Sequence, residues 1–172
     1  EQGLDGASGN VEGYEREVLD GSVNANHLQV IGELTKTPVA TGAELVGYGG
    51  WSNDSGILGP FSLGAGTGDY YFALWMYNDS AGTSCPIIDH GIYPFSGNNA
   101  RIEYDLVTRG VRSRIVTGNS TSYDPLRTGW SLVVGGRRDG DLFITVNGAE
   151  SVSPVTDSSD IDITDSQISI GT

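Results

Sequence analysis

The sequence predicts an all-β protein built as an antiparallel two-sheet sandwich. Glycine is abundant, with 26 among 172 residues, which suits tight turns between short strands. Short runs rich in aromatic and β-branched residues recur along the chain and are separated by clusters of Gly, Asn, Asp and Ser. No segment requires a helix longer than about two turns, and we expect about ten to twelve strands in all.

The strongest predicted strand is Tyr70 to Tyr77, because it is dense in aromatic and bulky residues. Strand alternation places Tyr70, Phe72, Leu74 and Met76 on one face and Tyr71, Ala73, Trp75 and Tyr77 on the other. Since both faces are hydrophobic, we expect a central strand that is covered on both sides. Trp75 and Trp130 are both predicted to lie in the core.

A β-hairpin is predicted between Trp130 and Gly148. It consists of a strand over 130–134, a turn over 135–140, a return strand over 141–146 and a second tight turn at Asn147-Gly148. Within the first turn, Asp139-Gly140 supplies the residues that accept positive φ angles.

Further strands are predicted at 27–34, 44–48, 86–92, 101–107 and 111–116, around Ile161 and Ile163, and at Ile168 to Ile170. The first 26 residues differ in composition from the rest. We interpret 1–26 as a linker or assembly arm and 27–172 as the sandwich.

The net charge of −13 argues against nucleic acid or an anionic membrane as a partner. No apolar run approaches the ~18 residues of a membrane span, so no membrane insertion is expected. Cys85 is the single cysteine, which leaves no intrachain disulfide to form.

Five short segments resemble the laminin-G-like, concanavalin-A-like jelly rolls. They are Trp130-Ser-Leu-Val-Val, Arg138-Asp-Gly, Leu142-Phe-Ile-Thr-Val-Asn-Gly, Gly66-Thr-Gly-Asp ahead of the strand with Trp75, and Ile168-Ser-Ile-Gly. The resemblance implies a jelly-roll sandwich. Members usually continue past the last of these segments with a closing strand, so we expect the final strand to be missing or supplied by another chain.

A narrower resemblance lies in residues 28–48, which are similar to the segment that introduces this domain in tail-fibre and other virion proteins of tailed bacteriophages. It implies a non-catalytic structural protein on the particle exterior, for host-surface glycan adhesion or for decoration of the capsid or tail. The implied partners are other virion proteins, copies of the chain in a symmetric oligomer, and cell-surface glycans.

Two alternatives remain open. The first is a carbohydrate-binding module of a bacterial surface protein, located at the cell surface or secreted. The second and weaker one is a glycoside hydrolase, since some concanavalin-A-like folds carry catalytic carboxylates on a strand. Here Glu103-Tyr-Asp-Leu-Val-Thr lacks the second glutamate of that signature, and a retaining mechanism needs two carboxyl groups. No catalytic residue is therefore predicted.

Two groups of binding residues are candidates. Aromatic rings that could stack on a sugar are Tyr48, Trp51 and Tyr123. The resemblance implies calcium as the candidate cofactor, because many laminin-G-like domains bind it through Asp and carbonyl oxygens. The candidate ligands are Asp54, Asp79, Asp160 and Asp162. Solvated surface carboxylates and buried aromatic anchors are the alternative interpretations of both groups.

Overall fold

The structure is a computed structural model, and it is all-β with antiparallel sheets. The residues that it describes are 9–10, 17–18, 26–41, 46–52, 54–59, 62–79, 85–92, 96–105, 107–115, 118–121, 124–150, 154–162 and 167–171. None of these residues is helical. The chain divides into two compact units, which are 1–59 with 169–172, and 60–168.

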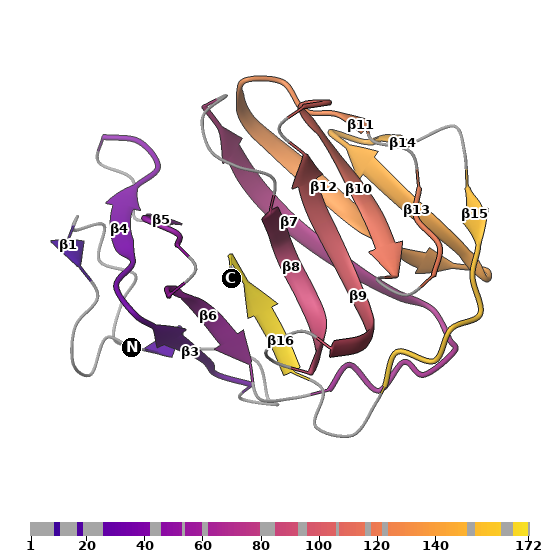
Figure 1. The fold of residues 1–172 in the computed structure, drawn as a ribbon. Coiled ribbons are helices and arrows are strands. Elements are labelled where there is room, and N and C mark those ends of the chain that lie inside the picture. The colour runs from indigo at the N-terminus through magenta and orange to yellow at the C-terminus, as the bar shows by residue number, and fades with distance from the viewer. Residues whose placement is uncertain are drawn as a thin grey trace. The chain divides into compact units, whose positions relative to one another are not determined.

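The described part of the first unit has six short strands arranged in two sets of three, most of which are labelled in Figure 1. They are β1 (Gly9–Asn10), β2 (Glu17–Val18), β3 (Leu28–Ile31), β4 (Thr35–Pro38), β5 (Val46–Gly49) and β6 (Gly56–Gly59). In one set β4 pairs with β1 and β5, and in the other β3 pairs with β2 and β6. The observed strand is shorter than the predicted strand at 27–34, because β3 ends at Ile31 and the chain turns before β4.

A small apolar cluster holds the first unit together. Val30, Leu34 and Ile57 are buried in it, and Leu28, Tyr48 and Ile170 pack against it. Gly32, which follows β3, has a φ of 67°, and a Cβ there would collide with the carbonyl oxygen of Asp54. Glycine is thus required at this turn.

The described strands of the second unit form two antiparallel sheets. The first sheet has the order β11-β10-β9-β8, formed by Asp124–Pro125, Gly110–Ile115, Ser96–Asp105 and Cys85–Ile92. The second has the order β14-β13-β12-β7, formed by Ala149–Glu150, Asp141–Val146, Gly129–Arg138 and Tyr70–Asn78, and β15 (Val155–Thr156) pairs with β13. The remaining strand, β16 (Gln167–Ile170), covers the predicted strand at Ile168 to Ile170.

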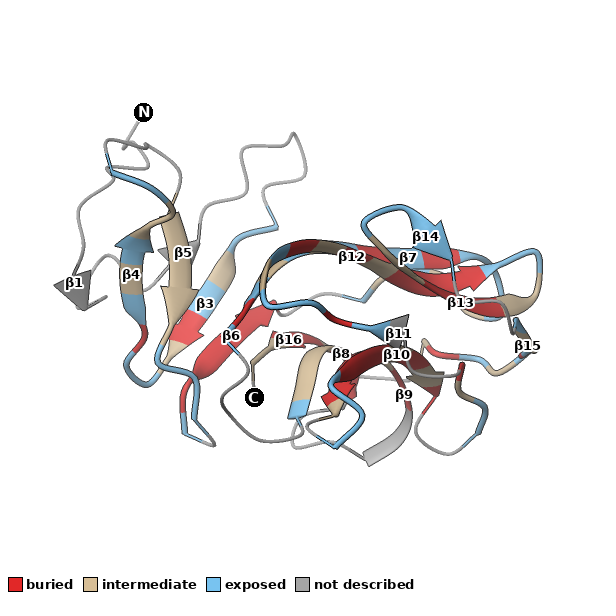
Figure 2. Ribbon diagram, turned by 90° about the horizontal axis from the view of Figure 1, so that it is seen from above, coloured by how far each residue is buried: buried red, intermediate tan, exposed pale blue. Residues whose placement is uncertain are grey.

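The core of the second unit lies between its two sheets. In Figure 2, β12 and β13 lie over β9 and β10, and the buried residues line the space between them. Ile102 of β9 and Ile144 of β13 are fully buried and meet at Gly135, where a Cβ would approach both side chains too closely. The Ser113 hydroxyl of β10 donates to the Gly136 carbonyl oxygen at 3.4 Å. The arrangement is consistent with a β-sandwich.

In the hairpin over 130–148, the predicted turn residues are confirmed, but the predicted length of the first turn is wrong. Asp139 and Gly140 both have positive φ, as a two-residue turn requires, and so do Asn147 and Gly148. The predicted turn over 135–140 is too long, because β12 continues through Arg138 and pairs in register with Asp141 onwards. Gly135 and Gly136 therefore belong to the strand and allow close packing.

The prediction that Tyr70 to Tyr77 is a central strand is wrong. β7 has the expected residues, but it is the last strand in the order of its sheet and pairs with β12 alone among the described strands. Its inward face, which begins with Tyr70 and Phe72, meets the core, whereas its outward face does not.

Candidate functional site

Four exposed aromatic side chains lie on the outward face of the second sheet. Tyr71, Trp75 and Tyr77 of β7 are 70%, 64% and 57% exposed, and Trp130 of β12 is 44% exposed. Successive side chains of a strand alternate between faces, so the three β7 residues share one side. We call these four residues the aromatic strip.

The cross-strand register makes the aromatic strip continuous. Trp130 pairs with Tyr77, and their rings meet edge to face with centroids 5.4 Å apart. Next to them, Leu132 pairs with Trp75, so an aliphatic side chain borders the ring. Contiguous exposed apolar patches of this kind mark interaction sites in soluble proteins.

The outward face of β12 is more apolar than its inward face. Trp130, Leu132 and Val134 point outward, whereas Ser131, Val133 and Gly135 point to the core. A sheet packed only to bury apolar surface would show the opposite distribution. The outward face therefore carries hydrophobic residues that the core does not explain.

An open depression of about 510 Å³ lies at the Tyr71 end of the aromatic strip. Its lining residues are Leu63, Gly64, Ala65, Asp69, Tyr70, Tyr71, Arg137, Arg138 and Phe143. The guanidinium of Arg138 sits 4.9 Å from the ring centroid of Phe143 and donates to both carboxylate oxygens of Glu150, at 2.8 and 3.0 Å. Apolar walls and hydrogen-bonding groups thus meet in one place.

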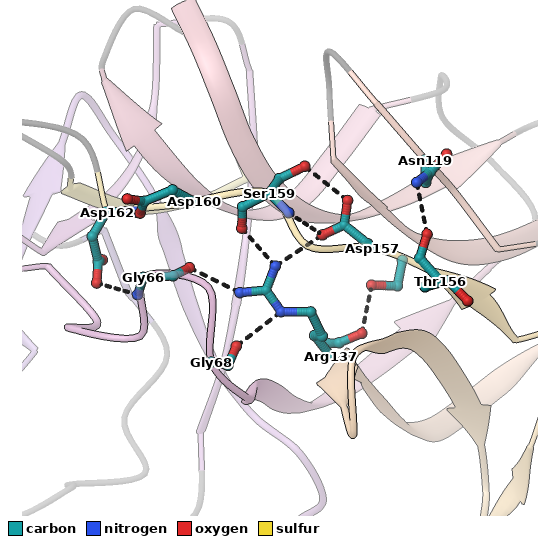
Figure 3. A network of polar contacts seen from close by, with 11 residues as sticks. Gly66, Gly68, Asn119, Arg137, Thr156, Asp157, Ser159, Asp160 and Asp162 are labelled. Atoms are coloured by element: carbon teal, nitrogen blue, oxygen red, sulfur yellow. Dashed lines mark hydrogen bonds and ion pairs between the residues drawn. The ribbon is translucent and has the colours of Figure 1, made fainter.

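A buried arginine holds the loop that borders this depression (Figure 3). The Arg137 side chain is fully buried and donates to the carbonyl oxygens of Gly66 and Gly68 at 2.8 Å each and of Ser159 at 2.6 Å. It also donates to the Asp157 carboxylate at 2.8 Å. A planar guanidinium can donate to several acceptors at once. Arg137 thus connects the loop over 62–69 and the segment over 157–162 to β12.

Asp162 also joins the loop over 62–69 to the segment over 157–162. Its carboxylate accepts hydrogen bonds of 2.6 Å from the Ser62 hydroxyl and from the Gly66 amide. Burial acts to raise the pKa of Asp162, but the hydrogen bonds from Ser62, Gly66 and Gly64, together with His90, hold the pKa below its usual value. Together with Arg137, these contacts fix the loop over 62–69.

His90 is a structural side chain of the first sheet. It is fully buried, and its Nε2 accepts a hydrogen bond of 3.2 Å from the Leu63 amide. Burial lowers the pKa of His90, although Asp162 lies 3.8 Å away. The imidazole thus joins the first sheet to the 62–69 loop through the Leu63 amide.

On the face of the first sheet that points away from the core, β9 and its neighbours carry a row of charged residues. Arg112 is directly opposite Glu103 and bonds its carboxylate, and Arg114 approaches the same carboxylate at 3.5 Å. Arg101 is directly opposite Asp89 and contacts it at 2.7 Å. Burial raises the pKa of Asp89 to about 6, although Arg101 opposes this. These residues bond one another.

The aromatic residues predicted as ligand contacts lie in different surroundings. Tyr48 is half-buried against the apolar cluster of the first unit. Trp51 is 40% exposed, and its ring lies where a Cβ on Gly171 would be. Tyr123 lies outside the described residues. None of the three belongs to the aromatic strip.

Of the four carboxylates predicted for calcium, the structure brings two together. The Asp162 amide donates to the Asp160 carboxylate at 3.0 Å, and Asp160 is exposed. Asp54 and Asp79 are exposed. Among the described residues, no three side chains of His, Cys, Asp or Glu gather as a metal ion would require. Calcium binding stays a prediction.

The assignment of Trp75 and Trp130 to the core is wrong, because both residues are exposed. Trp75 and Trp130 belong to the aromatic strip, so this strip was not predicted from the sequence. Hydrophobic residues on both faces of 70–77 are the signal in the sequence, and they are equally consistent with a strand that leaves one apolar face exposed.

The part of the chain that the structure describes contains no helix long and apolar enough to cross a membrane. Comparison with protein-family models, curated proteins and solved structures gives no match for this chain.

Proposed function

We propose that this chain is a non-catalytic glycan-binding protein with a jelly-roll sandwich, carried on the exterior of a tailed-bacteriophage virion. The observation that supports glycan binding is the aromatic strip, with three exposed rings on one strand and a fourth beside them. Pyranose rings have apolar faces that stack on aromatic rings, and Tyr and Trp supply a large rigid contact area together with a polar group.

The depression beside Tyr71 supplies the polar part of such a site. Asp69 and Arg138 line it and can exchange hydrogen bonds with sugar hydroxyl groups. Arg137 and Asp162 hold the bordering loop through bonds of 2.6–2.8 Å. A site that is formed before the ligand arrives avoids the entropy cost of ordering it on binding.

The surroundings of Glu103 favour a non-catalytic protein. Its carboxylate is bonded by Arg112 and approached by Arg114, and the residue is 8% exposed. A retaining glycosidase nucleophile must reach the anomeric carbon with a second carboxyl group ~5–5.5 Å away. A carboxylate bonded by two arginines on a sheet face is placed for structure instead.

The virion setting rests on the resemblance of residues 28–48 and has its own test. Mass spectrometry of purified phage particles should find this chain as a stoichiometric component. Its absence from particles, with the chain found instead in a bacterial surface protein, would overturn the setting and leave the glycan proposal standing.

Glycan binding is tested by applying the purified chain to an array that includes bacterial capsular and lipopolysaccharide glycans. We expect binding that Trp75→Ala weakens about tenfold or more, since one well-packed aromatic contact contributes on the order of 2 kcal/mol. The matched control is Trp51→Ala, which removes the same ring from the first unit. An array without bound glycan, or a loss caused by Trp51→Ala alone, would overturn the proposal.

A further inference from the structure

β7 forms an edge of the second sheet. Among the strands that the structure describes, β7 pairs with β12 alone, which leaves one side of Tyr70–Asn78 without a strand beside it. The amide and carbonyl groups on such a side can pair with a strand of another chain.

The chemistry of this edge limits what can pair with it. Tyr70–Asn78 contains no charged residue, although the whole chain carries a net charge of −13. Leu74 and Met76 point toward the core but are only half-buried, so apolar surface is left at the edge. A neutral, apolar strand of the same kind fits this edge best.

We propose that the edge pairs with β7 of a second copy of this chain, antiparallel, with the two-fold axis at Ala73. In that register Ala73 faces its own counterpart, and Tyr71 faces Trp75 of the second copy. On the inward side Phe72 faces Leu74, and Tyr70 faces Met76. Every pair within the strand is apolar or aromatic, which is favourable for cross-strand contacts.

Charge selects this register over its neighbour. With the axis at Ala73, Asp69 faces Tyr77 of the second copy. With the axis at Leu74 it would face Asp79, and like charges directly opposite one another are destabilising. A closed two-fold contact of this type also covers both edges at once and cannot extend into a fibre.

The dimer would join two aromatic strips into one surface. Tyr71 of each copy would border Trp75 of the other on the outward face. A polymeric glycan could then engage both copies, and the second engagement would be intramolecular. This consequence rests on the proposed glycan function, whereas the strand pairing does not.

The test is analytical ultracentrifugation of the full chain without sugar, over a range of protein and salt concentrations. We expect a dimer that salt strengthens, because two chains of −13 repel each other. Ala73→Lys should raise the dimer dissociation constant at least about tenfold, since it sets two lysines opposite each other. Ala149→Lys in the exposed β14 adds the same charge at the other end of the sheet and should leave the dimer unchanged.

A mixture of Ala73→Lys and Ala73→Glu should restore the dimer, because the two-fold register sets lysine opposite glutamate. Hydrogen exchange of the wild-type chain gives a second measurement, and amides of 70–78 should gain protection as protein concentration rises. A wild-type monomer at all concentrations, equal effects of the two lysine variants, or a mixture that stays monomeric would overturn the proposal. None of these outcomes depends on glycan binding.

Discussion

Arg137 donates a hydrogen bond of 2.8 Å to the carboxylate of Asp157, and both side chains are withdrawn from solvent. The two residues come from β12 and from the segment after β15, so their pairing joins parts of the second unit that are distant in sequence. Three carbonyl oxygens share the same guanidinium. A buried charge that is paired and hydrogen-bonded is tolerated, whereas one left alone is costly.

Arg137→Met should destabilise the second unit by about 3–5 kcal/mol, because it leaves a buried carboxylate without its cation and removes the side-chain donor from three carbonyl oxygens. The Gly66 oxygen keeps a hydrogen bond of 3.1 Å from the Ile161 amide. Urea unfolding of the wild type, Arg137→Met, Asp157→Asn and the double variant gives the coupling between the two residues. We expect the double variant to lose much less than the sum of the single losses. Strict additivity would show that the pair is not an energetic unit.

Asp89→Asn should change how stability depends on pH. The pKa of Asp89 is raised from 3.8 to about 6 by burial, so the folded state holds its proton more tightly than the unfolded state. The stability that protonated Asp89 provides is present below about pH 4 and is lost as the pH rises through about 6. Relative to Asp89→Asn, the wild type should therefore lose on the order of 3 kcal/mol between pH 4 and pH 7.

Urea titrations at a series of pH values measure that difference. Asp54→Asn, which removes the same charge at an exposed position, should run parallel to the wild type. A difference between wild type and Asp89→Asn that stays constant, or that grows in favour of the wild type at higher pH, would contradict the raised pKa. His90 is present in both proteins, so its titration cancels.

Asp139→Val should destabilise the hairpin by about 1–2 kcal/mol. Asp139 has a φ of 53°, and a β-branched residue tolerates this left-handed conformation poorly. Asp139→Asn is the control, because Asn-Gly is at least as good in this turn and should unfold at the same denaturant concentration as the wild type. If Val and Asn behaved alike, the positive φ at this position would be refuted.

Local features of the fold were predictable because they depend on neighbouring residues. Tyr70 to Tyr77 was predicted as a strand, and β7 spans 70–78. Asp139-Gly140 and Asn147-Gly148 were predicted as tight turns, and both have the positive φ angles that such turns need. The alternation of side chains in a strand and the residue types of a tight turn both depend on only a few neighbouring residues.

The covered side of each strand was not predictable, since it depends on which strands and sheets lie nearby. On β12 the pattern is misleading: Trp130 and Leu132 point outward, while Arg137 points inward to Asp157. Arg137 can be buried because the carbonyl oxygens of Gly66, Gly68 and Ser159 accept its hydrogen bonds. The residues next to Arg137 in the sequence do not reveal these distant acceptors. Long-range contacts thus decided the location of the candidate site.

Glycan contact with the aromatic strip is tested most directly by acrylamide quenching of tryptophan fluorescence. In Trp51→Phe the remaining tryptophans, Trp75 and Trp130, both belong to the strip. Because both are exposed, quenching should be efficient in the free protein, and the best glycan from the array should reduce it in a saturable way. Binding of that glycan without any change in quenching would place the ligand elsewhere and contradict the account.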